Sequence, residues 1–418
     1  MKNIDTGSLV VRKYEHGGKQ GRFVMCRRTG ARCLLEGTAA TFFDIASCGS
    51  EEAVRRFGEL AASFDAPPEL IAADYDRFVD GLAHTLSKTD TKETNRILPA
   101  LWERGITPMV MVELLHPCNL KCFHCYIGHR GNETHHQSRL VRDLPALKAR
   151  LIEMGCVELT VTGGEIRLVP EILDILSELS RDFIVTALTN GTLWTAEERR
   201  RLAALPLKEV RSTLFSWDPV VHDAITMEAG SWLKTLEFIT DLKRLGAPVG
   251  VNTPVLAANA NSVPELVKRL AAEDIEVVVD VTCFQGPGTR DCRASSAQLE
   301  PLFRAGIAPR LERRQCVGIR HKVRIGPDGA IFPCEYLSNK LGDIFDGRTM
   351  RELRATPLAQ GIMAKMASEP AGPQCESCGS KDVCFNCIAF NIAENGDAAI
   401  PSSYICDLNR LSGMVAKK

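Results

Sequence analysis

Three cysteines follow directly on an apolar run, and this order constrains the fold more than any other feature of the chain. The run covers residues 109–115 and predicts a short buried strand, after which Cys118, Cys122 and Cys125 come in the spacing C-x3-C-x2-C. Three thiolates from one loop would hold three irons of a 4Fe-4S cube and leave its fourth iron without a protein ligand. A zinc site with a distant fourth ligand is the alternative that this spacing leaves open.

The segments that follow alternate between strand and helix patterns. A β-branched run at 157–162 ends in Gly163-Gly164-Glu165, and further strand-like runs cover 184–188, 207–215, 249–255 and 275–281. Between them, apolar residues recur at helical spacing, as in Leu144, Leu147, Leu151 and Met154. Six strands separated by helices predict an α/β fold whose parallel sheet curls into a partial, TIM-like (β/α)6 barrel. Ligands of such barrels bind at the carboxyl ends of the strands, where the cysteine loop and Gly-Gly-Glu both fall.

The cysteine loop, with His124 before its last cysteine, resembles that of the radical S-adenosylmethionine (SAM) enzymes, and the Gly-Gly-Glu one βα unit later strengthens the resemblance. In that family the open iron chelates the amino and carboxylate groups of SAM, whose reductive cleavage gives a 5'-deoxyadenosyl radical that abstracts hydrogen from the substrate. The resemblance assigns Gly163, Gly164 and Glu165 to the amino group of SAM, since glycines allow close backbone approach and a carboxylate accepts from an ammonium. The resemblance also implies SAM contacts by four further residues: Thr189, Asn190, Ser212 and Asn252. Each of them has an alternative role as a turn former or as a polar group at a strand edge.

The composition of the chain restricts the cell compartment and the kinds of partner that we expect for it. The chain has 418 residues, which exceeds one ordinary core and predicts two or three domains. With 51 basic and 52 acidic residues its net charge is -1, so we expect neither nucleic acid nor a membrane as partner. Sixteen cysteines without a signal peptide favour metal ligation over disulfides and predict a cytoplasmic protein.

Seven more cysteines fill the last quarter of the chain, and a turn pattern at 326–329 predicts a hairpin among them. Their spacing resembles the SPASM extension of radical SAM enzymes, although the last central pair is spaced x2 where that family more often has x3. The resemblance implies two auxiliary 4Fe-4S clusters, one held by Cys375, Cys378, Cys384 and Cys406, the nearer one by Cys316, Cys334 and Cys387. The fourth site of the nearer cluster would be open to a substrate thiolate or closed by Cys283 or Cys292, and zinc is the alternative for the central run. The remaining cysteines, predicted to be buried apolar residues, are Cys26, Cys33, Cys48 and Cys156.

The N-terminal residues form a separate pattern without cysteine motifs. Segments 8–14 and 23–35 predict short strands, a helix opens at about residue 38, and two amphipathic segments follow up to Leu82. This arrangement resembles the small peptide-binding protein of pyrroloquinoline quinone biosynthesis, a winged-helix-like recognition element for ribosomally made, post-translationally modified peptides (RiPPs). In that family a leader peptide adds as a strand to the sheet edge and rests on the last helix. A winged helix for DNA is the alternative, but the later helices are acidic or neutral rather than basic.

Together these patterns predict a domain order and a function. We expect a recognition element at 1–90, a linker at 91–105, a radical SAM barrel at 106–300 and a SPASM domain at 301–418. The resemblance implies a peptide maturase with three 4Fe-4S clusters and SAM, a precursor peptide as partner, and an electron donor such as flavodoxin or ferredoxin. Its expected product is an intrapeptide crosslink, preferably a Cys thioether of the sactipeptide or ranthipeptide type. The alternatives are a carbon-carbon crosslink, formylglycine formation as in sulfatase maturases, and a non-enzymatic zinc protein.

Overall fold

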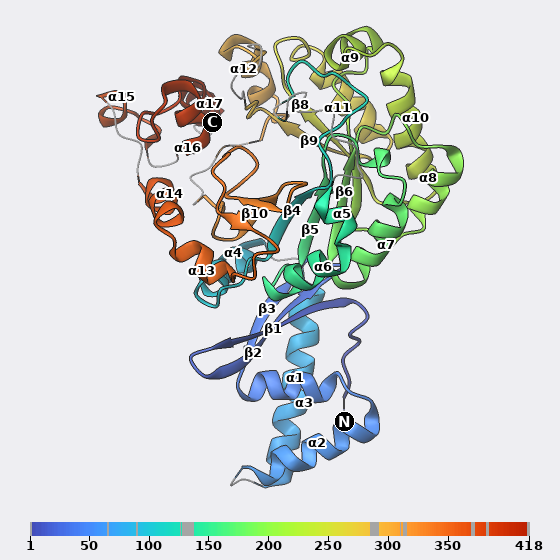
Figure 1. The fold of residues 1–418 in the computed structure, drawn as a ribbon, viewed down its shortest axis with the longest axis vertical. Coiled ribbons are helices and arrows are strands. Elements are labelled where there is room, and N and C mark those ends of the chain that lie inside the picture. The colour runs from blue at the N-terminus through green and yellow to red at the C-terminus, as the bar shows by residue number, and fades with distance from the viewer. Residues whose placement is uncertain are drawn as a thin grey trace.

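The chain folds into three regions that follow one another along the sequence (Figure 1). The structure is a computed structural model that describes residues 2–64, 67–88, 91–125, 127, 138–284, 292–309, 311, 316–368, 373–381 and 384–415. We refer to residues 2–88 as the N-terminal module, to 106–284 as the barrel and to 316–415 as the C-terminal region. None of the helices in the described ranges has both the length and the apolar character needed to cross a membrane.

The N-terminal module is a three-stranded antiparallel sheet with helices packed on one face. Its elements are β1 (Leu9–His16), β2 (Lys19–Cys26), β3 (Arg32–Glu36), α1 (Thr38–Ala46), α2 (Ser50–Ala62) and α3 (Pro68–Ser87), with β2 as the middle strand. Val24 and Leu35 from the sheet share a core with Phe43 of α1 and Leu82 of α3. The predicted strands and helices are confirmed, except that 23–35 holds parts of two strands, because Gly30 at φ 72° reverses the chain between them.

Two arginines fix the module to the base of the barrel. Arg12 of β1 is 5% exposed and donates from Nε to the carbonyl of Cys156 and from Nη2 to that of Asp182, both at 2.6 Å. Arg27 donates from Nη1 to the carbonyl of Phe183 at 2.7 Å. The accepting carbonyls of Asp182 and Phe183 lie at the C-terminal end of α7 (Ile172–Asp182), where carbonyls lack intrahelical partners and attract positive charge. The module therefore lies at the amino ends of the barrel strands.

Most of the segment predicted as a linker is instead the helix α4 (Thr91–Glu103). Leu101 is fully buried in the core that joins β1 to the barrel, and Arg104 forms an ion pair with Glu36 at 2.7 Å. The apolar residues of the second half of the segment recur at helical spacing, which the polar first half obscured: Ile97, Leu98, Leu101 and Trp102. This helix joins the module and the barrel as packed structure.

The barrel contains the six predicted strands, all of which are confirmed. They run parallel in chain order as β4 (Met109–Glu113), β5 (Glu158–Thr162), β6 (Ile184–Thr189), β7 (Glu209–Thr213), β8 (Val249–Pro254) and β9 (Glu276–Asp280). The segments between them form α5 (Arg139–Arg142), α6 (Leu144–Glu153), η2 (Ile166–Leu168), α7, α8 (Ala196–Ala203), α9 (Pro219–Thr226), α10 (Ser231–Arg244) and α11 (Val263–Ala272).

Side chains alternate between the two faces of these strands. Val110, Val161 and Val210 pack into the main core together with helix residues such as Leu147 and Leu242. The intervening positions form the opposite, inner face, and several of them are polar and half-buried, as at Thr160, Arg211 and Asn252. A polar inner face suits a barrel that receives a ligand.

A hairpin from the C-terminal region extends the sheet beside the first barrel strand (Figure 1). β10 (Lys322–Ile325) pairs in parallel with β4, and β11 (Ala330–Phe332) and β12 (Gly342–Asp343) follow antiparallel, giving the order β12-β11-β10-β4-β5-β6-β7-β8-β9. The hairpin predicted at 326–329 is confirmed, with Gly329 at φ 88° in its turn. This pairing brings a cysteine-bearing hairpin next to the strand that precedes the cysteine loop.

The remaining helices pack in two places. α12 (Ser296–Arg304), α16 (Ile388–Asn395) and α17 (Ser403–Val415) pack at the β9 side of the barrel, whereas α13 (Met350–Ala355) and α14 (Pro357–Ala367) pack against the extension formed by β10, β11 and β12. The short helix α15 (Pro373–Glu376) comes between α14 and α16 in the chain. Leu302 of α12 and Leu408 of α17 lie in a second core that includes Val279 of β9. This core attaches the last helix, and Cys406 on it, to the barrel.

Candidate functional site

The cysteine loop leaves the carboxyl end of β4 and is held from the far side by α9. Lys121 and Phe123 donate their backbone N–H groups to the carbonyls of Thr226 (3.1 Å) and Ile225 (3.3 Å) at the end of that helix. The ring of His124 meets that of Phe215 edge-on at a centroid distance of 4.9 Å. These contacts fix the loop backbone from Lys121 to His124.

The three thiols of the loop lie close enough to influence one another. Partial burial raises the pKa of Cys118 to about 11 and that of Cys122 to about 12, and the charge of Cys125 contributes to both shifts. Hydrogen bonds to the Cys118 sulfur from the backbone of Leu120 (3.4 Å) and the Asn190 amide (3.8 Å) oppose its shift. Burial thus favours neutral thiols here, and a bound cationic metal would reverse that preference.

This donor set fits a 4Fe-4S cluster with one open iron. Each thiolate of such a set binds a different iron, so the sulfurs stand further apart than around one ion, where Zn–S bonds of about 2.3 Å bring them together. In the described ranges, no three His, Cys, Asp or Glu side chains form a group that could hold a single metal ion. Cys118, Cys122 and Cys125 are the residues that would hold the cluster.

Gly163 and Gly164 follow β5 and lie against the start of the cysteine loop. Gly163 has φ 155°, and a Cβ at this position would stand 2.5 Å from the carbonyl oxygen of Leu115. A Cβ on Gly164 would collide with the carbonyl oxygen of Pro117. The backbone of Gly164 also donates to Leu115 O at 2.8 Å. Only glycine allows the two segments to approach this closely.

Glu165 is fully buried and joins the ends of two neighbouring strands. Its carboxylate accepts from the Thr189 hydroxyl at 2.6 Å, from the Asn190 backbone N–H at 2.7 Å and from the Arg167 backbone N–H at 2.9 Å. Burial raises the pKa of Glu165, and these donors oppose the shift. The carboxylate therefore fixes Asn190 in the position from which its amide reaches Cys118.

The structure thus brings together most of the residues predicted for the SAM site. Cys118, Glu165, Thr189 and Asn190 form one connected network, which Asn119 extends by accepting from the Asn190 amide at 2.9 Å. The contacts of these residues with SAM itself stay predictions.

The other two predicted contacts lie on opposite faces of their strands. Asn252 is on the inner face of the barrel and accepts from Arg211 at 3.2 Å. Ser212 is 1% exposed, shares the helix-facing side of β7 with Val210, and its Oγ has no partner among the described residues. A SAM contact by Ser212 stays a prediction, but Thr213, one position on, is the β7 residue that faces inward.

Sequence reasoning missed several residues around the site. Arg211 forms an inner-face network with Glu209, at 2.5 Å, and Glu276, at 3.1 Å. Phe215 donates its backbone N–H to Nδ1 of the buried His222 at 3.2 Å. The alternation of charged and apolar residues in β7 was the available signal for Arg211. The segment from Leu214 to Asp223, which contains His222, loosely resembles thioether-forming members of the family, but this resemblance did not predict the contact with Phe215.

The resemblance assigns the seven C-terminal cysteines to two groups, and within each group some of the cysteines lie close enough to influence one another's pKa. We name the first the Cys334 group (Cys316, Cys334 and Cys387): burial raises the pKa of Cys334 to about 12, with Cys387 among the contributors, and Cys316 contributes to the raised pKa of Cys387. The second, the Cys406 group, consists of Cys375, Cys378, Cys384 and Cys406. Cys375 and Cys378 both contribute to the raised pKa of Cys406, and Asn409 on the same helix donates to Cys384 Sγ at 3.6 Å. Their ligation of clusters stays a prediction.

Cys283 and Cys292 lie beside each other. Their sulfurs are 3.9 Å apart in a small core with Phe215, which the cysteine-loop residue Phe123 also contacts. Of the four cysteines predicted to be buried, Cys26 and Cys156 are buried, while Cys33 and Cys48 are half-buried.

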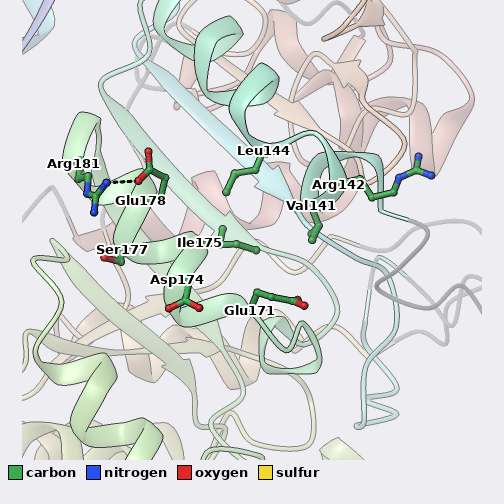
Figure 2. Close-up of a pocket in the computed structure, with 9 residues that line it drawn as sticks. All are labelled: Val141, Arg142, Leu144, Glu171, Asp174, Ile175, Ser177, Glu178 and Arg181. Atoms are coloured by element: carbon green, nitrogen blue, oxygen red, sulfur yellow. Dashed lines mark hydrogen bonds and ion pairs between the residues drawn. The ribbon is translucent and has the colours of Figure 1, made fainter.

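An open cavity of about 810 Å³ lies elsewhere on the barrel surface, between α5, the start of α6 and α7 (Figure 2). Its lining mixes charges of both signs, including the Glu178–Arg181 ion pair of α7. It contains none of the predicted site residues, so it plays no part in the site described above.

Comparison with known proteins shows which protein family the barrel resembles. Residues 112–270 match the family model described as Radical SAM superfamily. These residues form a radical SAM domain, so the protein is an enzyme with radical SAM chemistry, and its relatives include proteins named for peptide modification.

Three relatives illustrate the range of the family. The chain is 30% identical over 164 residues to the antilisterial bacteriocin subtilosin biosynthesis protein AlbA of Bacillus subtilis, covering 38% of this chain and 35% of that protein. It is 22% identical over 349 residues to the PqqA peptide cyclase of Rhodopseudomonas palustris, covering 75% and 90%. A probable GTP 3',8-cyclase of Sulfolobus acidocaldarius is 27% identical over 266 residues, covering 56% and 83%.

Solved structures share the fold over most of the chain. Streptococcus suis SuiB bound to S-adenosylmethionine aligns over 97% of this chain and 100% of its own, with a TM-score of 0.66 and 18% identity. SuiB bound to precursor peptide SuiA aligns over the same shares with a TM-score of 0.62 and 17% identity. Native anSMEcpe with bound AdoMet and Cp18Cys peptide covers 74% of this chain and 96% of its own, at a TM-score of 0.60 and 16% identity.

Proposed function

We propose that this enzyme is a leader-guided peptide maturase. It binds the leader of a ribosomally made precursor through the N-terminal module, abstracts a hydrogen atom from the core peptide and joins two of its residues, preferably as a thioether between a Cys sulfur and a carbon. The thiol would release its proton to solvent, and the electron left over from bond formation would pass to an auxiliary cluster. The relatives named for subtilosin biosynthesis and PqqA cyclisation, and the fold shared with SuiB, support a peptide substrate.

The observation that carries this proposal is the open strand edge of the module. In the described part of the chain, β3 pairs with β2 on one side and has no strand on the other. Leu35 of β3 packs beside Leu82 and Leu86 of α3, so a peptide added along β3 would lie near that helix. An extended peptide gains main-chain hydrogen bonds at such an edge.

The cofactor set of the proposal is three 4Fe-4S clusters and SAM, with reducing electrons from a flavodoxin or ferredoxin in the cytoplasm. The first cluster and SAM, when bound, supply a 5'-deoxyadenosyl radical. The chain's own residues do the positioning: α9 holds the cysteine loop, Gly163 and Gly164 let β5 approach it, and Glu165 orients Asn190 toward Cys118.

A thioether is preferred over the alternatives because the Cys334 group contains three cysteines. A cluster with three protein thiolates keeps one iron open for a substrate thiolate. The two cysteines considered as a fourth ligand, Cys283 and Cys292, contact each other. A carbon-carbon crosslink and formylglycine formation remain the alternatives, and the product separates them: only a thioether consumes a peptide thiol while joining two residues.

A proline pair on β3 tests the role of the module. Successive residues of an antiparallel strand point their N–H groups alternately toward and away from the partner strand. We therefore compare Cys33→Pro with Leu34→Pro. One of these variants loses a backbone N–H that points away from β2, toward the proposed peptide, and the other loses a backbone hydrogen bond to β2. We expect the outward variant to weaken leader binding at least about 10-fold, as measured by fluorescence anisotropy, with its thermal stability kept. Lys13→Pro, on the opposite edge strand β1, is the matched control, and unchanged leader affinity in both β3 variants would refute this binding mode.

A further inference from the structure

A buried ion pair connects the strand before the cysteine loop with the hairpin that carries Cys334. Arg324 of β10 donates from Nη1 to Oε2 of Glu113 at 2.7 Å, and both side chains are nearly inaccessible, at 10% and 1% exposed. Glu113 is the last residue of β4, five positions before Cys118. The parallel pairing of β10 with β4 places the two residues on adjacent strands.

Arg324 also reaches the Cys334 group directly. Its Nε donates to the backbone carbonyl of Cys334 at 3.4 Å, and its guanidinium lies 4.0 Å from the ring centre of Phe332 on β11. The guanidinium of Arg324 therefore has three contacts, with Glu113 on β4, with Phe332 on β11 and with the carbonyl of Cys334 after β11. These contacts hold it between the first cysteine loop and the Cys334 group.

The carboxylate of Glu113 depends on this arginine for its charge compensation. Its second oxygen, Oε1, is buried and has no hydrogen-bond partner among the described residues. A second basic group, His116, has its Nε2 3.8 Å from Oε2. Burying a carboxylate without a partner costs free energy, and Arg324 supplies that partner for Glu113. The two residues therefore place one positive and one negative charge at fixed positions inside the protein.

We propose that Glu113 and Arg324 set the reduction potential of the iron-sulfur centre held by the Cys334 group. The inference deepens the proposed function and rests on its auxiliary clusters. Reduction adds a negative charge to a cluster, and a neighbouring guanidinium stabilises that charge while a neighbouring carboxylate opposes it. The pair is nearly neutral as a whole, so each partner limits the effect of the other.

The proposal predicts shifts of opposite sign for the two partners. Arg324→Gln leaves the carboxylate uncompensated and shifts the midpoint potential to more negative values. Glu113→Gln leaves the guanidinium uncompensated and shifts it to more positive values. The double variant, with glutamine at both positions, has no net charge at this site, as the Glu113–Arg324 ion pair has none. Its midpoint potential should therefore be close to that of the parent. Arg324→Lys, which keeps the charge, changes the potential least among the single variants.

The measurement is potentiometry followed by electron paramagnetic resonance on the anaerobically reconstituted full-length chain. Replacing Cys118, Cys122 and Cys125 by alanine in all samples removes the first cluster, so that about eight irons per chain remain from two cubes. Only one of the two remaining signals should shift. Arg22→Gln, which breaks the Arg22–Asp44 ion pair in the N-terminal module, is the matched control and should leave both signals in place.

Each outcome decides the question. Opposite shifts of one signal, restored in the double variant, would establish the inference. Two signals that stay fixed in every variant would overturn it and leave the auxiliary clusters intact. Iron well below eight per chain in the parent would overturn the auxiliary clusters themselves, and this inference with them.

Discussion

The two cysteine-bearing parts of the molecule are built on different principles. Around Cys118, the buried carboxylate of Glu165 accepts hydrogen bonds from three protein donors at 2.6 to 2.9 Å, so this part of the site is held by the protein itself. Around the Cys406 group, the backbone N–H groups of Cys378, Lys381 and Cys384 each donate to a carbonyl three residues earlier over 3.2 to 3.4 Å, and α15 has only four residues. The barrel thus carries a preformed site, whereas the second site depends on whatever its cysteines bind. We expect the barrel to fold without its cluster and the C-terminal turns to require theirs.

The strongest test of this contrast removes the first site. Replacing Cys118, Cys122 and Cys125 by alanine should lower SAM cleavage by at least about three orders of magnitude, because the donor set of the first cluster is lost. The melting temperature should change by only a few degrees, since the surrounding network does not include a metal. Cleavage is measured as 5'-deoxyadenosine by chromatography, and cleavage at the parental rate would contradict the assignment.

Removing the second site should affect stability instead. Cys375→Ser, Cys378→Ser and Cys406→Ser together should destabilise residues 373–415 by on the order of 5 kcal/mol, because structural metal centres supply folding free energy outright. Hydrogen exchange followed by mass spectrometry should show faster exchange there and unchanged protection in β4 to β9. The triple alanine variant of the first site, with the same number of cysteines removed, is the control. If both variants lost hydrogen-exchange protection to the same extent, the proposed difference between the two cysteine-bearing sites would be wrong.

Glu165→Gln tests whether the first site is held by the protein itself. The amide nitrogen replaces one of the two carboxylate oxygens, so an N–H donor then faces the backbone N–H of either Asn190 or Arg167 and the negative charge is lost. Breaking a buried charged network in this way costs about 3 to 5 kcal/mol. The free energy of unfolding is measured in urea on the cluster-free chain. The surface variant Glu171→Gln should cost less than about 0.5 kcal/mol. A negligible effect of Glu165→Gln would mean that the network does not support the barrel site.

A smaller, pH-dependent effect is expected at His222, which binds the Phe215 backbone behind the cysteine loop. Burial lowers its pKa to about 4, so between pH 6.5 and 4 the unfolded chain binds a proton that the folded chain does not. Stability therefore falls as the pH falls through this window, by about 2 kcal/mol at pH 5 for this group.

His222→Gln provides the comparison, because the other histidines are common to both proteins. The stability difference between parent and variant should shrink by about 2 kcal/mol from pH 7 to pH 5. A difference that stays constant over this range would show that His222 is not held neutral by burial.

Local patterns predicted the elements well and their long-range partners poorly. The six barrel strands and the 326–329 hairpin followed from β-branched runs and turn residues, which act over a few positions. The pairing of β10 with β4 joins residues more than 200 positions apart, and no local pattern encodes it. The helix α4 was not predicted, because its polar start outweighed the apolar residues later in the helix, among them the buried Leu101.

The same limit applies to the site. The sequence places Gly163, Glu165 and Asn190 at strand ends, and parallel strands bring such ends together, so their convergence was predictable. The orientation of Ser212 depends on which face of β7 its neighbours cover, and the Glu113–Arg324 pair depends on strand order. Both require the assembled sheet.

The docking of the N-terminal module by Arg12 and Arg27 has a consequence for the length of the substrate. The module is fixed at the amino ends of β5 and β6, and the cysteine loop leaves the opposite, carboxyl end of β4 (Figure 1). The strands between have about five residues, or about 17 Å, and the loops at both ends bring the path to roughly 30 Å. An extended peptide covers this distance with about ten residues. If the module binds a leader as proposed, a precursor needs a spacer of about that length between its leader and the first residue that is modified.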